Sequence, residues 1–239
     1  MSHPFRTILL ALALTVIGSA DAWAQKPGGR SKVLLRRDRL AAQWDTVDCV
    51  KNMFKINPLL FLRGEIPLYY EHALTHNLSL EVAVGITYRN YINIEVAGDD
   101  LDAFDAGTEI LPKVSYHIGA RYYLTDDIEP QGTYLQAEFV HLDYSKNIAQ
   151  KDSTGQFTGG KLLDQRVYND LRLLFGYQRL GGNSNWLFDL YGGVAFRTRD
   201  MRIVHETLDL TNDRWSYDIE EKHDNVPAFF LGVKVGLGF

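Results

Sequence analysis

The sequence predicts an all-β protein, an eight-stranded antiparallel up-and-down transmembrane β-barrel that occupies residues 53–239. Three observations lead to this prediction. Apolar residues recur at every second position in segments of about nine to fourteen residues, the period of a strand with two different faces. Short and long connecting segments alternate along the chain, and a signal for export precedes them.

Residues 1–24 have the three parts of a secretory signal peptide. Arg6 gives the start a positive charge, an apolar run follows from Ile8 to Ile17, and Ala22-Trp23-Ala24 matches a signal-peptidase site. The apolar run has about ten residues, whereas a permanent transmembrane helix needs about 20. We therefore expect cleavage before Gln25, and because Gln25 is not a cysteine, a lipid-anchored lipoprotein is not indicated.

Residues 25–52 are rich in basic residues and follow no sustained period, so we expect a flexible periplasmic N-terminal arm with one helical turn at most. The single cysteine, Cys49, cannot form an intramolecular disulfide and has no histidine cluster near it, so neither a metal nor a cofactor is predicted. The net charge of −5 and the lack of a basic stripe argue against nucleic-acid binding.

Four segments alternate most regularly, at residues 78–89, 113–124, 186–197 and 229–239. Two others alternate less cleanly, at 171–178 and 134–144, and we expect a β-bulge near Phe139-Val140 where the phase is lost. The stretch 53–72 is split at Gly64 into two strands, 53–62 and 65–72.

The connecting segments supply the strand count. Those at 73–77, 125–131 and 181–184 are short, whereas those at 91–108, 145–166 and 198–225 are long. Outer-membrane barrels have short periplasmic turns, long extracellular loops and, in bacterial single chains, an even number of strands. Counted back from a last strand that ends at the periplasm, the chain has eight strands, with a short outer tip near Arg63-Gly64.

The polar faces of these strands carry both signs of charge, which indicates that they point into the barrel. The residues concerned are Glu71, Glu81, Arg89, Lys113, Arg121, Glu138, Arg172, Asp189, Arg197 and Lys234. Eight strands leave room inside only for side chains, where opposite charges can pair. The apolar faces would then meet lipid, with interfacial aromatic girdles from Tyr70, Tyr88, Tyr122, Tyr144, Trp186 and Phe196. A soluble sandwich or a lipocalin-like barrel, with its apolar faces inward, is the alternative.

The runs Asn57-Pro58-Leu59-Leu60-Phe61-Leu62, Leu68-Tyr69-Tyr70-Glu71-His72-Ala73-Leu74 and Leu78-Ser79-Leu80-Glu81-Val82 resemble the small outer-membrane β-barrel proteins of unknown function common in Bacteroidota, with an OmpA/OmpX-like architecture. The terminal Phe239, with apolar residues at alternate positions before it, looks like the signal read by the barrel assembly machinery. The resemblance implies a cell outer-membrane location with lipid and lipopolysaccharide as partners, and it transfers no catalytic residues.

The predicted outer loops are where a ligand could bind. Loop 91–108 holds Glu95, Asp99, Asp100, Asp102 and Asp105; a divalent-cation site is one interpretation and a solvated acidic loop the favoured one. Loop 198–225 mixes acids with Trp215, which could anchor a partner, although a self-packed loop tip is favoured over extended strands.

The expected role is structural or surface-interacting, without catalysis, cofactor, metal or a large pore. Loop-mediated adhesion or ligand binding is a first alternative. A lipid-A-modifying enzyme is a second, since His141, Asp143 and Ser145 share one strand face. Residues two apart on a strand lie roughly 7 Å apart, which strains a direct contact between nucleophile, base and acid.

Overall fold

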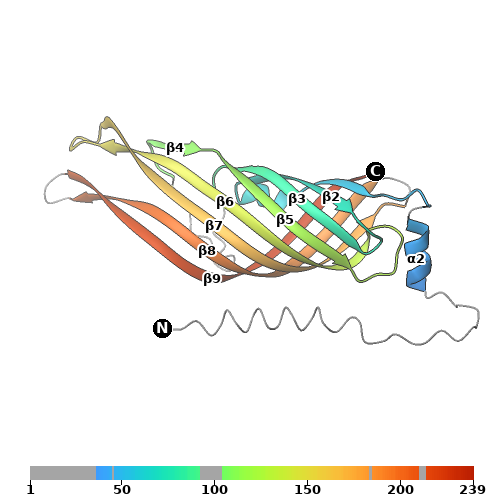
Figure 1. Ribbon diagram of the computed structural model, residues 1–239. Coiled ribbons are helices and arrows are strands. Elements are labelled where there is room, and N and C mark those ends of the chain that lie inside the picture. The colour runs from blue at the N-terminus through green and yellow to red at the C-terminus, as the bar shows by residue number, and fades with distance from the viewer. Residues whose placement is uncertain (1–35, 45, 92–103, 183–184, 210–213) are drawn as a thin grey trace, which may run out of the picture. The chain divides into compact units, whose positions relative to one another are not determined.

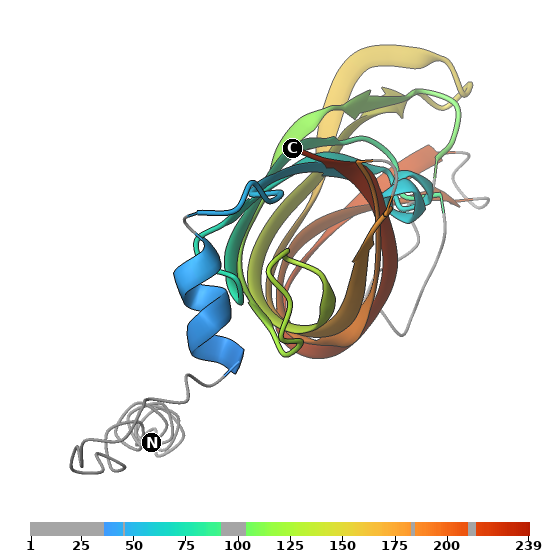
Figure 2. The same cartoon turned by 90° about the vertical axis from the view of Figure 1, so that its right-hand side faces the viewer.

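The alternating segments form strands that close into a ring. The computed structural model describes residues 36–44, 46–91, 104–182, 185–209 and 214–239. Eight strands pair antiparallel with their neighbours in the chain: β1 (Asn52–Ile56), β2 (Glu65–Ala73), β3 (Leu78–Thr87), β5 (Lys113–Tyr123), β6 (Gly132–Lys151), β7 (Phe157–Leu180), β8 (Trp186–Asp209) and β9 (Arg214–Gly238). Pairing of β1 with β9 completes the ring (Figure 2). The predicted eight-stranded, antiparallel, up-and-down arrangement is therefore confirmed.

A short ninth strand, β4 (Thr108–Leu111), pairs with Ser145–Ile148 of β6 and lies outside the ring. The strands themselves differ greatly in length. β1, β2, β3 and β5 have 5 to 11 residues, whereas β6 to β9 have 20 to 25. The four long strands consequently run past the ring on one side (Figure 1).

The two ends of the ring are different. The turn end carries the short connections 74–77, 124–131 and 181–185 together with Asn52 and Phe239. The opposite end, which we call the hairpin end, carries the far ends of β6 and β7 and of β8 and β9 (Figure 1). We call the parts of β6 to β9 beyond the ring, residues 142–151, 157–168, 199–209 and 214–224, the protruding sheet.

The protruding sheet corrects two loop predictions. Residues 145–166 and 198–225 are mostly paired strand, in register from Ser145 opposite Gln165 and from Thr198 opposite Asn225. These strands cannot be recognised from the sequence, because their outward positions are polar. The alternation of apolar residues therefore ends, although the backbone hydrogen bonds between the strands continue. The expected bulge at Phe139-Val140 is also wrong: these residues pair directly with Leu171 and Asp170, and the register shifts at Ala149/Lys151 instead.

The predicted strand 53–62 is wrong beyond Ile56, because residues Pro58–Leu62 form a short helix, α3. The Asn57 side chain accepts a hydrogen bond from the Leu59 amide, at 3.2 Å, and Pro58 starts the helix, where its missing N–H is not needed. Gly64 then turns the chain at φ 77°, and a Cβ there would lie 1.9 Å from the Arg89 carbonyl oxygen. Only glycine fits this tip.

The N-terminal arm contains more helix than the single turn expected. α2 spans Arg36–Trp44, nine residues, and the Arg36 guanidinium donates to the Asp126 carbonyl at 3.3 Å. The predicted signal peptide and residues 25–35 lie outside the described residues.

Side chains alternate strictly between the inside and the outside of the ring, and the polar ones point in. In β3, Ser79, Glu81 and Thr87 are 0–1% exposed, whereas Val82, Val84 and Ile86 are 43–64% exposed. This is the reverse of a soluble sandwich or a lipocalin, whose apolar faces are buried.

Candidate functional site

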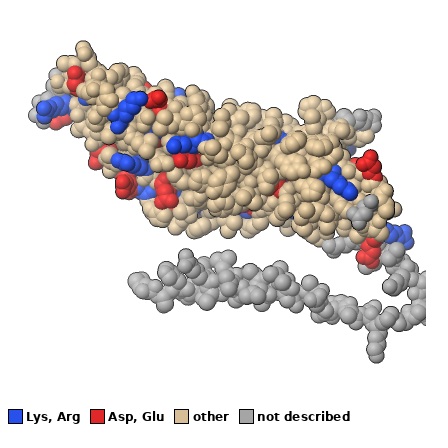
Figure 3. Space-filling view, turned by 45° about the horizontal axis from the view of Figure 1, so that its top comes forward, with Lys and Arg blue, Asp and Glu red and all other residues tan. Residues whose placement is uncertain are grey.

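An apolar band surrounds the ring on its outer face. Each strand contributes exposed aliphatic or aromatic side chains, among them Phe54, Leu68, Leu80, Val84, Ile118, Leu135, Leu171, Leu173, Phe175, Phe188, Leu190, Phe229 and Leu231. On the face drawn in Figure 3, acidic and basic side chains gather toward the two ends of the molecule and are sparse between them. Soluble monomers rarely expose contiguous apolar patches above a few hundred Å².

Aromatic residues lie at the margins of this band, as predicted for most of them. Tyr88, Tyr122, Trp186 and Phe196 are 40–62% exposed, and Tyr70 is half-buried. Tyr144 is the exception: its side chain points inward and its hydroxyl donates to the Arg63 carbonyl at 3.2 Å. A bulge at Phe139-Val140 would shift the phase of this strand and place Tyr144 outside, but the strand pairs without a shift there and Tyr144 points inward.

Inside the ring near the turn end lies a balanced charge cluster. Three bases, Lys55, Arg121 and Lys234, meet three acids, Glu71, Glu81 and Asp189, and all six side chains are 0–1% exposed. The Arg121 guanidinium lies 3.1 Å from Glu71, 3.0 Å from Glu81 and 3.1 Å from Asp189. Because every charge has an opposite partner, the cluster fills the ring without a net buried charge.

A second buried cluster lies farther toward the hairpin end. Asp170 accepts hydrogen bonds from Arg172 and Arg197, both at 2.7 Å. His117 lies between two carboxylates, with Nε2 2.6 Å from Glu65 and Nδ1 3.3 Å from Glu138. The faces of several rings cover the guanidinium groups; Phe230 lies 4.1 Å from Arg172. The buried His117 thus links two acidic side chains inside the ring.

Sequence reasoning identified most of these interior charges and missed four of them. Lys55 and Glu65 fall in the irregular stretch 53–72, and Asp170 lies one residue before the segment taken as a strand. His117 lies on the polar face of the segment 113–124, where the pattern predicts a structural or solvated histidine and not its two carboxylate partners. Extending the period-2 pattern by two residues in β7 would have found Asp170. The contacts between strands could not be read from any single segment.

Beyond the ion clusters the interior becomes apolar. Val140, Leu142, Tyr144, Tyr168 and Met201 form a buried cluster at the base of the protruding sheet. Next to it, the Arg199 guanidinium donates to Asp224 at 2.7 Å, and this hydrogen bond holds the pKa of the Asp224 carboxyl below its usual range. The inner face of the sheet is thus covered by its own side chains where it leaves the ring.

The tips of the two hairpins touch each other. The Lys151 amide donates to the Tyr217 hydroxyl at 2.7 Å, and the Lys151 ammonium lies 2.9 Å from Glu206 and 4.4 Å from the centre of the Trp215 ring. Trp215 is half-buried by this contact. Trp215, the residue predicted as an anchor for a partner, therefore contacts Lys151 of the same chain. The segment 198–225 forms paired strands, and its far end packs against the β6–β7 hairpin.

On its β9 side the protruding sheet ends in a free strand edge. Among the pairings of the described residues, β9 is bonded to β1 only from Val235 to Gly238, so its edge facing away from β8 has no strand partner from Arg214 to Lys234. Asp218, Glu220, Lys222 and Asp224 alternate along this edge. Charged side chains on an edge strand hinder pairing with an arbitrary second chain.

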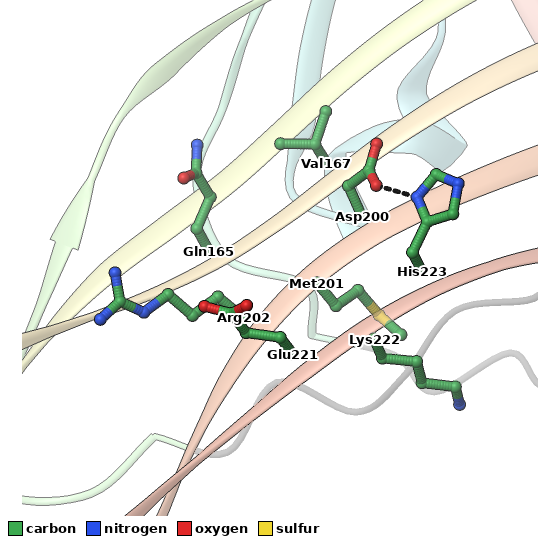
Figure 4. A pocket seen from close by; sticks show the side chains of 8 residues that line it. All are labelled: Gln165, Val167, Asp200, Met201, Arg202, Glu221, Lys222 and His223. Carbon is green, nitrogen blue, oxygen red and sulfur yellow. Dashed lines mark hydrogen bonds and ion pairs between the residues drawn. The ribbon is translucent and has the colours of Figure 1, made fainter.

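A groove of about 300 Å³ lies on the outer face of β7, β8 and β9 within the protruding sheet (Figure 4). It is lined by Gln165, Val167, Asp200, Met201, Arg202, Glu221, Lys222 and His223. His223 bonds to Asp200 through Nδ1. Acids and bases alternate along the groove, so it has no single charge with which to select a ligand.

The three residues considered for hydrolysis do not meet. Ser145 donates to Asp143 at 2.7 Å, but His141 is bonded to Asn169 at 2.8 Å and stacks on Tyr116, with ring centres 4.9 Å apart. A nucleophile without a base in reach gains no activation.

The acidic loop 91–108 is described only in part. Glu95, Asp99, Asp100 and Asp102 lie outside the described residues, and Asp105 is exposed. Within the described ranges, no group of three or more His, Cys, Asp or Glu side chains is placed to hold a metal ion.

None of the helices in the described part of the chain is long and apolar enough to cross a membrane. No family model matches the sequence, and searches of curated proteins and of solved structures returned no match. The resemblance to outer-membrane barrel proteins therefore rests on the motifs alone.

Proposed function

We propose that this chain is an integral outer-membrane β-barrel protein with a structural or surface-interaction role. The observation that carries the proposal is the inside-out distribution of side chains: paired charges fill the ring, and apolar side chains cover its outer face. Neighbouring strands of the ring pair their backbone groups with each other, with β9 meeting β1 from Val235 to Gly238, and such pairing is the condition for crossing hydrocarbon with strands. A transmembrane strand needs about 9–11 residues; β2, β3 and β5 have 9, 10 and 11, and β1, with five, is followed by the helix α3.

In the proposed membrane orientation, the turn end lies in the periplasm and the protruding sheet lies outside the cell. Short periplasmic turns and longer extracellular segments are the usual arrangement, and the predicted signal peptide agrees with export. The packed interior supports a role without a large pore. The separation of His141 from Ser145 speaks against a lipid-A hydrolase built on these residues.

Phe239 supports both closure and assembly in this proposal. Its amide donates to the Asn52 carbonyl at 2.8 Å and its carbonyl accepts from the Asn52 amide at 3.0 Å, while its ring lies 5.6 Å from that of Phe54. These two hydrogen bonds join backbone atoms, so a substitution of the Phe239 side chain does not remove them. The exposed ring remains available to the barrel assembly machinery, the partner that we propose for it.

The proposal predicts that the protein is recovered in the outer-membrane fraction and migrates faster on gels when unheated than after boiling, because folded barrels resist detergent. Phe239→Ser should lower the amount of this heat-modifiable form in cells several-fold, yet leave the free energy of unfolding of the refolded protein, measured in urea, within about 1 kcal/mol of wild type, as expected for an exposed side chain. Recovery of the wild type as a soluble periplasmic protein would refute the proposal.

The protruding sheet is the surface that we propose for interaction, with its free β9 edge and polar outer face. An epitope tag inserted after Thr154, in the exposed turn between β6 and β7, should bind antibody on intact cells. The same tag inserted after Asp127, in a turn at the opposite end, should bind only after the outer membrane is permeabilised. The reverse pattern would mean that the barrel is inserted the other way.

A further inference from the structure

The apolar band is interrupted by a recess around Val235. A groove of about 640 Å³ is lined by residues of three neighbouring strands, among them Tyr177, Arg179, Trp186, Phe188, Leu190 and Val235. A second groove, of about 220 Å³, continues from Trp186 and Val235 to Ile56 and Leu68. Trp186 and Val235 belong to both, so the two grooves flank one exposed indole.

The pairing register explains the direction of this recess. Arg179 is opposite Phe188, Phe188 is opposite Val235, Val235 is opposite Ile56, and Ile56 is opposite Leu68. Strands of a barrel are tilted, so a row of paired residues climbs obliquely around the wall. The recess therefore begins at Arg179, one residue from the turn-end limit of β7, and climbs toward α3.

Arg179 is the unusual residue in this apolar surface. Its side chain is exposed on the outer face, between Tyr177 and the Gly181–Gly182 turn, and it lines the larger groove. Within the part of the chain that the structure describes, its guanidinium has no hydrogen-bonding or ionic partner. An arginine that has no partner among the described residues and lines an apolar groove is complementary to an anionic head group carrying apolar chains, and arginine binds phosphate with two parallel hydrogen bonds.

We propose that this recess is a binding site for an anionic phospholipid of the periplasmic leaflet. The phosphate pairs with Arg179, and the two acyl chains lie in the grooves on either side of Trp186. The inference rests on the proposed membrane orientation. Lipopolysaccharide is not the ligand, because it occupies the outer leaflet and Arg179 is at the turn end.

Trp186 provides a built-in probe for this site. In the mature chain the other tryptophans are Trp44 and Trp215, so a variant with both replaced by Phe reports from Trp186 alone. This variant is refolded into phosphatidylcholine vesicles, and its fluorescence is quenched by brominated phosphatidylglycerol or brominated phosphatidylcholine at equal mole fraction. One basic residue near a membrane surface contributes about a five-fold preference for anionic lipid, so phosphatidylglycerol should displace phosphatidylcholine about five-fold more readily.

Two variants test the assignment to Arg179. Arg179→Gln should bring the lipid preference close to one, while Arg214→Gln, which removes an exposed arginine at the hairpin tip, should leave it at the wild-type value. Equal quenching by both lipids in the wild-type background, or a preference unchanged by Arg179→Gln, would overturn the phospholipid site and leave the membrane orientation intact. If neither brominated lipid quenches Trp186, the outer face of the ring does not meet lipid, and the proposed membrane barrel is itself refuted.

Discussion

Replacing Arg121 with Met should lower the free energy of unfolding by about 3–5 kcal/mol, because it leaves one acid of the buried charge cluster without compensation. Arg121 contacts Glu71, Glu81 and Asp189 at 3.0–3.1 Å, and all four side chains are 0–1% exposed. Two bases, Lys55 and Lys234, would remain to balance three acids. The measurement is urea unfolding of the refolded protein in detergent micelles, followed by the heat-modifiable gel band.

Lys161→Met is the matched control for this experiment. Lys161 lies 2.6 Å from Glu109, but both side chains are more than half exposed. An ion pair this exposed is screened by solvent and contributes little to stability, so the urea midpoint should change little. The hydrogen bond from Lys161 also lowers the pKa of the Glu109 carboxyl. Similar midpoints for Arg121→Met and Lys161→Met would mean that the buried cluster does not stabilise the barrel.

Gly236→Val should prevent closure of the barrel. Gly236 pairs with Lys55 at the seam between β9 and β1, and a Cβ there would lie 2.1 Å from the Phe54 carbonyl oxygen. The contact is with backbone, so no side chain can move aside, and the strands must separate where the ring closes. We expect less than about a tenth of the wild-type yield of heat-modifiable protein on refolding, which corresponds to a loss above about 1.4 kcal/mol.

Gly192→Val distinguishes this clash from a general effect of adding a branched side chain. Gly192 lies on the outer face of β8, and its nearest neighbours would be 3.5 Å from a Cβ, an ordinary contact distance. Valine also favours strands. Its refolding yield should equal that of the wild type. If the two variants refold equally well, the seam tolerates the added side chain and the clash is not decisive.

The strands with one wholly apolar face were predictable from the sequence. β3, β5 and the turn-end halves of β8 and β9 follow the period-2 pattern without interruption, because nearly every outward position is apolar and most inward positions are small or polar, with Leu187 and Phe230 as exceptions. The charges on the polar faces also indicated which side is inside. The alternation of short and long connecting segments then predicted eight strands.

Features that depend on two distant segments were not predictable. The helix α3 replaces a strand because Asn57 and Pro58 form a helix start, and the gap that it fills exists only once β2 and β9 are in place. The strands of the protruding sheet have polar outer faces, so no apolar period marks them. Val140, Leu142 and Tyr144 appeared out of phase because their inner neighbours, Tyr168 and Met201, come from other strands.

The sequence by itself therefore determined the all-β class, the number of strands in the ring and the inward direction of the charges. These depend on the period of single strands, which is local. The tertiary structure alone decided which acids and bases pair, where the ring closes, how far the hairpins protrude and where Arg179 lies beside a groove. Each of these depends on the register between strands, and register brings together residues as far apart as Lys55 and Gly236.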